Sequence, residues 1–533
     1  MRLTASLVGV ALLASQAIGG EALMVPRYLD ETKTSGVAST YAGAWEFMVG
    51  GGVATFDCNA DGFTDMLLAG GENPATFYRN TSKQGESLKF VAEKSGLEFE
   101  DVTGAYGLDI DSDGITDVML LRVGENIVMR GLGNCQFERA NEAWNFAGGD
   151  GWSTAFAATF EKAATWPSLA VGNYINRTEE VSPWGSCTDN WLHRPAAAGS
   201  GFAAPLALSP SFCPLSMLFT DWNRSGTPSL RVSNDREYYE GGQEQLWKIL
   251  PRKMPELYSE KEGWKFLRIW GMGIAGHDVD LDGFPEYFLT SMADQKLQTL
   301  AAPGDGAKLQ PTYKDVAFAR GVTAHRPFIG DDLKPSTGWH TQFEDVNNDG
   351  RVDLFIAKGN VWEMPDFAMQ DPNNLLVQGD DGKFVEMADK AGVASVLQSR
   401  GAAVTDFNMD GLVDLVVVNR NGPAEIWRNT TASAGNWIGL KLLQKGTNRD
   451  GLGSWIETKF GDKVLRREIT SGGGHVSGGV GWWHFGLGGQ TTTEVRVLWP
   501  DGVAGDWHAN TSLPKLFASK AIDFTISKSS FEC

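Results

Sequence analysis

The fold that this sequence predicts is all-β: a seven-bladed β-propeller followed by a small, β-rich C-terminal domain. Three observations support the prediction. An acidic nine-residue motif recurs along the chain, short β-like runs flank each copy, and Gly and Trp are abundant, at 64 and 19 of 533 residues. Many short strands joined by tight turns, with periodic Gly and aromatic residues, are typical of propellers and related repeat folds.

The N-terminus predicts a secretory signal peptide over residues 1–22. Arg2 precedes an apolar run from Leu3 to Ala14, and small residues follow where a cleavage site is expected. The run is too short and wrongly flanked for a spanning helix, and we find no other apolar run of spanning length. We therefore expect a mature protein that is secreted or periplasmic and has no membrane span.

The repeat covers residues 23–432. The motif D-x-[DN]-x-[DS]-G-x-x-[DES] begins at residues 57, 109, 221, 278, 345 and 406, and a degraded copy begins at Glu161. Successive starts are 52 to 67 residues apart. Each copy leads into a β-like run such as "VMLLRV" and follows another such as "GAAVT". Four strands per repeat and about seven repeats predict the propeller.

The N-terminal segment is expected to close this ring. "YLDETKTSGV" at residue 28 has the form of the repeat endings, such as "FVEMADKAGV" at 384, although no acidic motif precedes it. We predict that this N-terminal strand completes the blade that begins at residue 401. Residues 433–533 then form the C-terminal domain and tail.

The acidic motif has the composition of a calcium loop. Alternating carboxylates with a Gly at the sixth position provide the oxygens that Ca²⁺ prefers, and without a cation such close carboxylates repel each other. An EF-hand would require Glu at position 12, where all six intact copies have an apolar residue, so the ninth residue is expected to close the cage. About five Ca²⁺ sites are predicted, with ligands from side chains 1, 3, 5 and 9 and from the carbonyl of residue 7: Asp57, Asn59, Asp61, Phe63, Asp65; Asp109, Asp111, Asp113, Ile115, Asp117; Asp278, Asp280, Asp282, Phe284, Glu286; Asp345, Asn347, Asp349, Arg351, Asp353; Asp406, Asn408, Asp410, Leu412 and Asp414.

Two copies depart from the pattern. Ser225 and Ser229 replace carboxylates in the loop that begins at Asp221, and the copy at Glu161 is one residue short, so metal binding there is less favoured. We expect the ions to fix the strand junctions; the alternative is that they bridge to a partner.

These repeats resemble the FG-GAP/VCBS repeats of secreted propellers and integrin α-subunits, where such loops bind Ca²⁺. A second resemblance lies in "NWIGLKLLQKGTNRDGLGSWIETKFGD" (436–462), "SGGGHVSGGVGWWHFGLGG" (471–489) and "EVRVLWPDG" (494–502). These segments are similar to the ASPIC/UnbV domain, which follows such propellers in secreted proteins of the cartilage acidic protein type. Within this domain, "SGGGHVSGGVG" lacks the strand-then-helix setting of a phosphate loop, and tight turns are the better interpretation.

Charge and motifs limit the function. The net charge of −20 argues against binding nucleic acid through bulk charge and suits a protein that binds cations. The favoured function is extracellular binding or adhesion, to a protein or glycan ligand. The alternative is a secreted enzyme that uses the central channel, where His277 and His340 are expected, on a polysaccharide or small organic substrate. No nucleophile, base and orienting group are evident, so an enzyme is the less favoured hypothesis.

The cysteines are consistent with an oxidising compartment. Five cysteines allow two disulfides and one unpaired residue. Cys187 and Cys213, which flank one irregular segment, are the expected pair.

Overall fold

A computed structural model describes residues 23–179, 185–197, 199–235, 242–302, 309–323, 334–362, 364–432, 434–444 and 446–510. The predicted signal peptide and Cys533 lie outside these ranges. The described chain is all-β, with 36 strands and only four short helical turns: η1 (Trp45–Phe47), η2 (Glu260–Glu262), α1 (Ala317–Arg320) and α2 (Ala388–Ala391). Within the described residues, no helix is long and apolar enough to cross a membrane.

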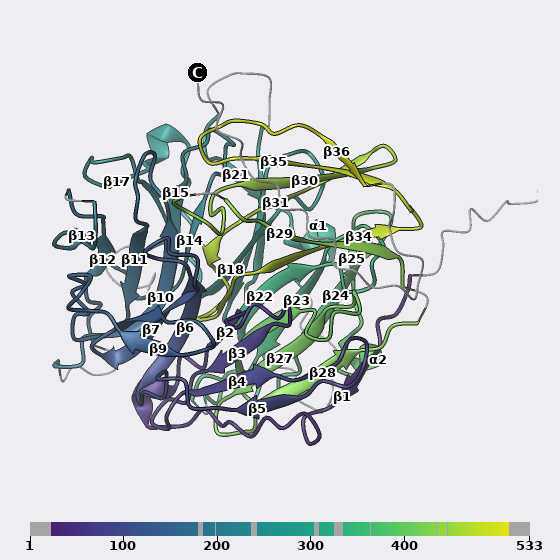
Figure 1. Ribbon diagram of the computed structural model, residues 1–533, viewed down its shortest axis with the longest axis horizontal. Helices are drawn as coiled ribbons and strands as arrows, with labels where there is room; N and C mark the ends of the chain where they lie inside the picture. The colour runs from purple at the N-terminus through teal and green to yellow at the C-terminus, as the bar shows by residue number, and fades with distance from the viewer. Residues whose placement is uncertain are drawn as a thin grey trace, which may run out of the picture.

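Residues 23–432 form seven successive groups of four antiparallel strands (Figure 1). Hydrogen bonds join the second and third groups through a short pairing of β7 with β10, at Trp152 and Val123. The groups are β2–β5 (Val53–Phe56, Asp65–Leu68, Thr76–Asn80, Phe90–Ala92); β6–β9 (Val102–Leu108, Asp117–Gly124, Ile127–Gly131, Phe137–Arg139); β10–β13 (Gly151–Thr159, Ser168–Asn173, Asn190–His193, Leu206–Leu208); β14–β17 (Pro214–Thr220, Ser229–Asn234, Gln245–Lys248, Glu256–Leu257); β18–β21 (Gly271–His277, Glu286–Ser291, Lys296–Leu300, Tyr313–Asp315); β22–β25 (Gly338–Glu344, Asp353–Lys358, Asn374–Gln378, Phe384–Glu386); and β26–β28 with β1 (Ser399–Thr405, Asp414–Asn419, Glu425–Asn429, Tyr28–Asp30).

The N-terminal strand β1 pairs antiparallel with β28, where the sequence predicted it. Figure 1 shows the two strands, purple and green, side by side despite their separation in the chain. Glu31, just after β1, is buried and pairs with Arg428 at 3.0 Å, and its second oxygen accepts a hydrogen bond from the Leu88 amide at 2.7 Å. One residue therefore ties the seventh group to the first.

The first strands of the seven groups, which we call the inner strands, contact one another in sequence. Each of β2, β6, β10, β14, β18 and β22 contacts the next inner strand, and β26 contacts β2. Neighbouring groups also pack through apolar side chains: Ala170 and Leu192 of the third group share a cluster with Met217, Leu230 and Trp247 of the fourth. The core therefore lies between the groups, and the inner strands form a closed series of contacts, whose centre we call the axis.

The C-terminal residues form two further sheets, which lie together at one side of the molecule (Figure 1). We call residues 434–510 the C-terminal region. One sheet pairs β29 (Asn436–Lys441) with β34 (Trp482–Gly488), and the other has the order β31–β30–β35–β36 (Lys463–Glu468, Trp455–Phe460, Thr493–Leu498, His508–Asn510).

The glycine-rich loop of this region, residues 470–481, does not form the tight turns of a self-contained domain that the sequence suggested. Its short strand β32 (Ser471–Gly472) pairs with inner strand β10, and β33 (Gly478–Gly479) pairs in parallel with inner strand β2. A Cβ at Gly472 would lie 2.8 Å from the Ala157 side chain, and one at Gly478 would lie 2.4 Å from the Tyr106 ring. Glycine is needed here because the backbone passes directly between the inner strands.

Two disulfides are present among the described cysteines. The Cys187–Cys213 bond confirms the predicted pair and joins the third and fourth groups. The second bond, Cys58–Cys135, joins the first acidic loop to the β8–β9 connection of the next group.

Candidate metal centres

The six intact acidic loops share one backbone geometry. The fourth residue has a positive φ of 53° to 63° in each loop, and the glycine at position six has φ between 75° and 98°. In every loop the amide of this glycine donates to the carboxylate of the first residue, at 2.7 to 3.2 Å. The sixth position requires glycine because other residues rarely adopt such a backbone.

The fifth and ninth carboxylates are also held by backbone amides. In the five loops predicted to bind metal, the fifth residue accepts a hydrogen bond from the amide of the seventh residue at 2.8 to 2.9 Å. The seventh residues Phe63, Ile115, Phe284, Arg351 and Leu412 thus position the fifth carboxylate. The ninth residue accepts from the amide of the second residue in each loop, for example Asp117 from Ile110 at 2.7 Å.

Some oxygens of these loops have no protein partner. Asp57 Oδ1, Asp109 Oδ1 and Asn408 Oδ1 are buried without a hydrogen bond, and the Asp57 and Asp109 side chains are each only 4 % exposed. A buried, unpartnered oxygen is costly unless a cation or water satisfies it. Hard oxygen donors of this type fit Ca²⁺.

Carboxylates converge in two of the loops. One oxygen each from Asp109, Asp111 and Asp117 lies within 4.8 Å of the others, and the same holds for Asp278, Asp280 and Asp282. The remaining predicted ligands lie in the same loop geometry but do not form such a triad among the described residues.

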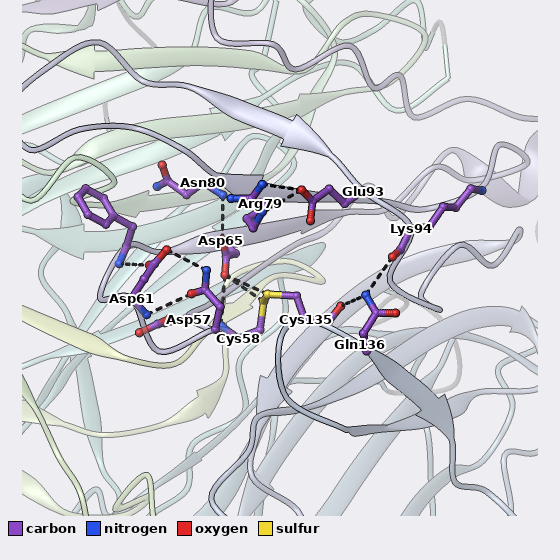
Figure 2. The surroundings of a disulfide bond; sticks show 12 residues. Asp57, Cys58, Asp61, Asp65, Arg79, Asn80, Glu93, Lys94, Cys135 and Gln136 are labelled. Atoms are coloured by element: carbon purple, nitrogen blue, oxygen red, sulfur yellow. Dashed lines mark hydrogen bonds and ion pairs between the residues drawn. A yellow bond between two sulfur atoms is a disulfide. The ribbon is translucent and has the colours of Figure 1, made fainter.

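A third cluster of possible metal ligands contains a disulfide. Cys58, Cys135 and Asp65 lie close together, but the two sulfurs are bonded to each other and offer no thiolate (Figure 2). Asp65 instead accepts hydrogen bonds from the amides of Asn80, at 2.8 Å, and Cys58, at 3.2 Å. The disulfide therefore fixes the second residue of this loop beside its ninth.

Burial and mutual repulsion disfavour the ionised carboxylates. Burial raises the pKa of Asp65 and Asp109 to about 7, and for Asp109 the neighbouring charge of Asp450 adds to the effect. Burial, followed by the charge of Asp280, raises the pKa of Glu286 to about 8. A divalent cation would reverse this balance by favouring the charged form.

Arginines neutralise part of the acidic charge. Arg130 contacts Asp111 and Asp113 at 3.1 Å each, and Arg351 pairs with Asp349 of its own loop at 2.7 Å. A cation in those loops would share these carboxylates with a guanidinium.

In the two loops that depart from the motif, other protein groups contact the first residue. In the degraded loop, Arg194 pairs with Glu161 at 2.6 Å, so a guanidinium occupies the position of a cation. In the loop at Asp221, both carboxylate oxygens accept loop amides at 2.8 Å, and Glu468 accepts a hydrogen bond from the Asp221 amide at 2.6 Å. These contacts explain how both loops fold without the full ligand set.

Comparison with known proteins places both parts of the chain. A model of the FG-GAP-like repeat matches residues 57–120 and 345–417, and a model of ASPIC and UnbV matches residues 444–512. The chain carries FG-GAP-like repeats and an ASPIC/UnbV domain. We use the second name for the whole C-terminal region, residues 434–510. "Cartilage acidic protein 1" of Homo sapiens is 47% identical over 106 residues, and that of Xenopus tropicalis is 47% identical over 57 residues.

The overlap with these relatives is short. The human match covers 19% of this chain and 16% of the relative, and the Xenopus match covers 10% and 9%. Among solved structures, BBS1N in complex with ARL6DN aligns with 78% of this chain and 99% of its own, at 10% identity and a TM-score of 0.44.

The ASPIC/UnbV domain also closes a cavity of about 150 Å³ against the inner strands. His277 and His340 both line this cavity, together with Glu344 and Arg467. Burial lowers the pKa of His277 to about 3 and that of His340 to about 4. Glu344 is held by Arg467 at 2.8 and 2.5 Å. The two histidines are thus brought to one cavity, as neutral groups beside an ion pair.

Residues that the sequence reasoning missed come from this domain. Lys441, Arg449 and Arg466 reach the first carboxylates of three acidic loops, at 3.4, 4.0 and 3.2 Å. No local motif identifies them, because their role depends on how the domain sits on the repeats.

Proposed function

We propose that this protein is a secreted or periplasmic, calcium-stabilised seven-bladed β-propeller that acts as an extracellular binding or adhesion-type protein for a protein or glycan ligand. The observation that carries the calcium assignment is the repeated loop geometry with buried, unpartnered oxygens at Asp57, Asp109 and Asn408. Each ion would be held by the first, third, fifth and ninth side chains of one loop and by the carbonyl of its seventh residue, and would neutralise repulsion at a strand junction.

The propeller assignment is supported by strand order. Seven groups of four antiparallel strands follow one another, their inner strands are in contact from β2 round to β26, and β1 completes the last group. Completing the last blade with the first strand removes a free edge and closes such a ring.

Export is supported by the disulfides and the N-terminal sequence. Cys58–Cys135 and Cys187–Cys213 are both formed, and structural disulfides persist in oxidising compartments. The residues before 23 have the pattern of a signal peptide.

The surface for a ligand is proposed at the end of the axis away from the acidic loops. There a well of about 240 Å³ is lined by Trp270, Trp339, Met272 and Met292 near the starts of β18 and β22 and the end of β19. Val361 also lines the well, and the next residue, Trp362, is 40 % exposed. Apolar wells with exposed aromatic residues are common recognition sites, and the loop end is covered by the ASPIC/UnbV domain.

An enzyme remains the second candidate, because His277, His340 and Glu344 share one cavity. The low pKa values of both histidines and the Glu344–Arg467 pair make general base catalysis at neutral pH unfavourable. Turnover of a polysaccharide or small organic substrate that is lost in His340→Ala, with the fold retained, would establish this alternative.

The calcium proposal is tested by melting the mature protein in about 10 mM calcium, ten times the weakest dissociation constant expected, and in excess chelator. Extracellular modules bind Ca²⁺ with dissociation constants of roughly 10⁻⁴ to 10⁻³ M, and at about ten times this value each site adds on the order of 1.4 kcal/mol. Five sites should shift the melting temperature by several degrees. Asp282→Ala should remove part of the shift, whereas Thr165→Ala in the degraded loop should leave it intact.

An unchanged melting temperature in chelator, with bound calcium confirmed absent by elemental analysis, would refute the stabilising role. The binding role is tested separately by probing glycan arrays and extracellular protein extracts with wild type and with Met272→Trp, which fills the well. Ligands that bind both proteins equally would place recognition elsewhere.

A further inference from the structure

The ASPIC/UnbV domain lies directly on the acidic loops. A Cβ at Gly411 would lie 1.8 Å from the Trp437 ring, and one at Gly114 would lie 2.3 Å from the Arg449 guanidinium. The Trp482 indole nitrogen donates to the Gly62 carbonyl at 3.1 Å. Three loops thus contact the domain at their sixth-position glycine, and at Gly114 and Gly411 the glycine serves the contact as well as the turn.

The domain also forms hydrogen bonds with the backbone of a fourth loop, which begins at Asp345. The amides of Gly435 and Gly488 donate to the carbonyls of Asn347 and Asn348, at 3.2 and 2.8 Å. The His484 Nε2 lies 2.6 Å from Asn348 Oδ1. These hydrogen bonds require the loop at Asp345 to keep the conformation that its carboxylates define.

Basic side chains of the domain contact the first carboxylates of two acidic loops. Lys441 approaches Asp57 at Oδ2, and Arg449 approaches Asp109 at Oδ2. In both residues Oδ1 is the buried oxygen without a partner. The domain therefore engages one oxygen of each carboxylate and leaves the other for a ligand inside the loop.

The same domain inserts its glycine-rich loop between the inner strands. The amides of Gly473, Gly474 and Val480 donate to the carbonyls of Met217, Ile274 and Thr55, at 2.6, 2.6 and 3.0 Å. The buried His475 accepts a hydrogen bond from the Gly50 amide at 3.2 Å. Contact with the acidic loops and insertion along the axis are therefore made by one continuous domain.

We propose that the ASPIC/UnbV domain contributes to the calcium sites and that its docking on the repeats is coupled to calcium occupancy. Lys441, Arg449 and Arg466 of the domain position the first carboxylates of the loops that begin at Asp57, Asp109 and Asp278. This inference rests on the proposed calcium binding. Ions fix the loop shape that the domain contacts, whereas emptied loops repel and lose that shape. The charges of Lys441, Arg449 and Arg466 oppose a cation at the same carboxylates, whereas the loop shape that docking maintains favours it. Because coupling is reciprocal, the net effect expected of a docked domain is tighter calcium binding.

The first experiment follows amide hydrogen exchange of the full mature protein in calcium chloride and in excess chelator. Exchange at Gly473, Gly474 and Val480 should rise about tenfold in chelator, an ordinary size for coupling between sites. The Tyr174 amide, which donates to the Trp152 carbonyl at 2.7 Å beside the well at the other end of the inner strands, is the internal control and should change less.

The second experiment tests the reciprocal effect with matched substitutions. Gly478→Val places a side chain against the Tyr106 ring, whereas Gly489→Val in the same domain meets nothing within 4 Å. Gly478→Val should weaken calcium binding, measured by titration calorimetry, by about fivefold or more, and Gly489→Val should match wild type. His475→Ala, which removes the contact without a clash, should act in the same direction.

The outcomes separate the two proposals. If elemental analysis and calorimetry detect no bound calcium, the calcium assignment and this inference both fail. If calcium binds but exchange of the glycine-rich loop is the same in chelator, and Gly478→Val and His475→Ala bind calcium like wild type, the inference is overturned while the calcium assignment stands.

Discussion

Replacing Cys58 and Cys135 by Ser should lower the melting temperature of the repeat domain by about 5 °C. The bond closes a loop of 77 residues, and loop-closure entropy assigns it about 4.5 kcal/mol. Residues 23–432, at about 2.1 cal/mol/K of unfolding entropy per residue, give roughly 0.9 kcal/mol/K, and the ratio of the two is the expected shift. Scanning calorimetry of the mature protein under non-reducing conditions measures it directly.

The second disulfide is the natural comparison. Cys187–Cys213 closes 26 residues, which corresponds to about 3.5 kcal/mol and a shift of about 4 °C. Because the two bonds join different pairs of groups, their effects should add in the fourfold variant. A loss below about 1 °C in Cys58→Ser/Cys135→Ser would refute the loop-entropy reasoning, since the serines retain nearly the same volume.

Two further predictions concern buried charges. Burial raises the pKa of Glu244 to about 8 from the usual 4.5. The protonated Glu244 therefore contributes its full stabilisation below pH 4.5, and this stabilisation is lost as the pH rises through 8. Because glutamine does not titrate, the melting temperature of Glu244→Gln relative to wild type should rise between about pH 5 and pH 9. A difference that stays constant across this range would contradict it. Arg194→Met should leave the Glu161 side chain buried without its ion-pair partner, at a cost of about 3 kcal/mol of stability in calcium and in chelator alike. The control Lys162→Met, at an exposed position of the same loop, should have little effect. A loss seen in chelator alone would show instead that calcium can occupy the degraded loop and replace the guanidinium.

The repeats were predictable because their signal is local. The carboxylates and the glycine at positions such as Gly411 specify a turn within nine residues, and the flanking apolar runs specify the strands it joins. The pairing of the N-terminal strand with the last group could also be predicted, because the segment that begins at Tyr28 has the form of a repeat ending without its repeat.

The position of the glycine-rich loop could not be predicted. Glycines carry no side chain that would indicate a neighbour, so residues 471–479 look the same in a surface turn as between the inner strands. For the same reason the contacts of Lys441 and Arg466 with the acidic loops could not be inferred, since they depend on the orientation of a whole domain. Cys58 was likewise not assigned a partner, because spacing alone does not determine disulfide connectivity.

The pairing of β1 with β28 has a consequence for the order of events during synthesis. Strand β1 must wait for Asn429 to be translated before it finds its partner, which at about 5–20 residues per second takes roughly 20 to 80 s. During that time β1 has no partner strand, and its edge is open to other strands. The ASPIC/UnbV residues are made after that, so the glycine-rich loop arrives when the inner strands are already in place. A nascent chain stalled before residue 425 would lack β28 (Glu425–Asn429) and leave the edge of β1 unpaired, so β28 of a completed chain could pair with it instead.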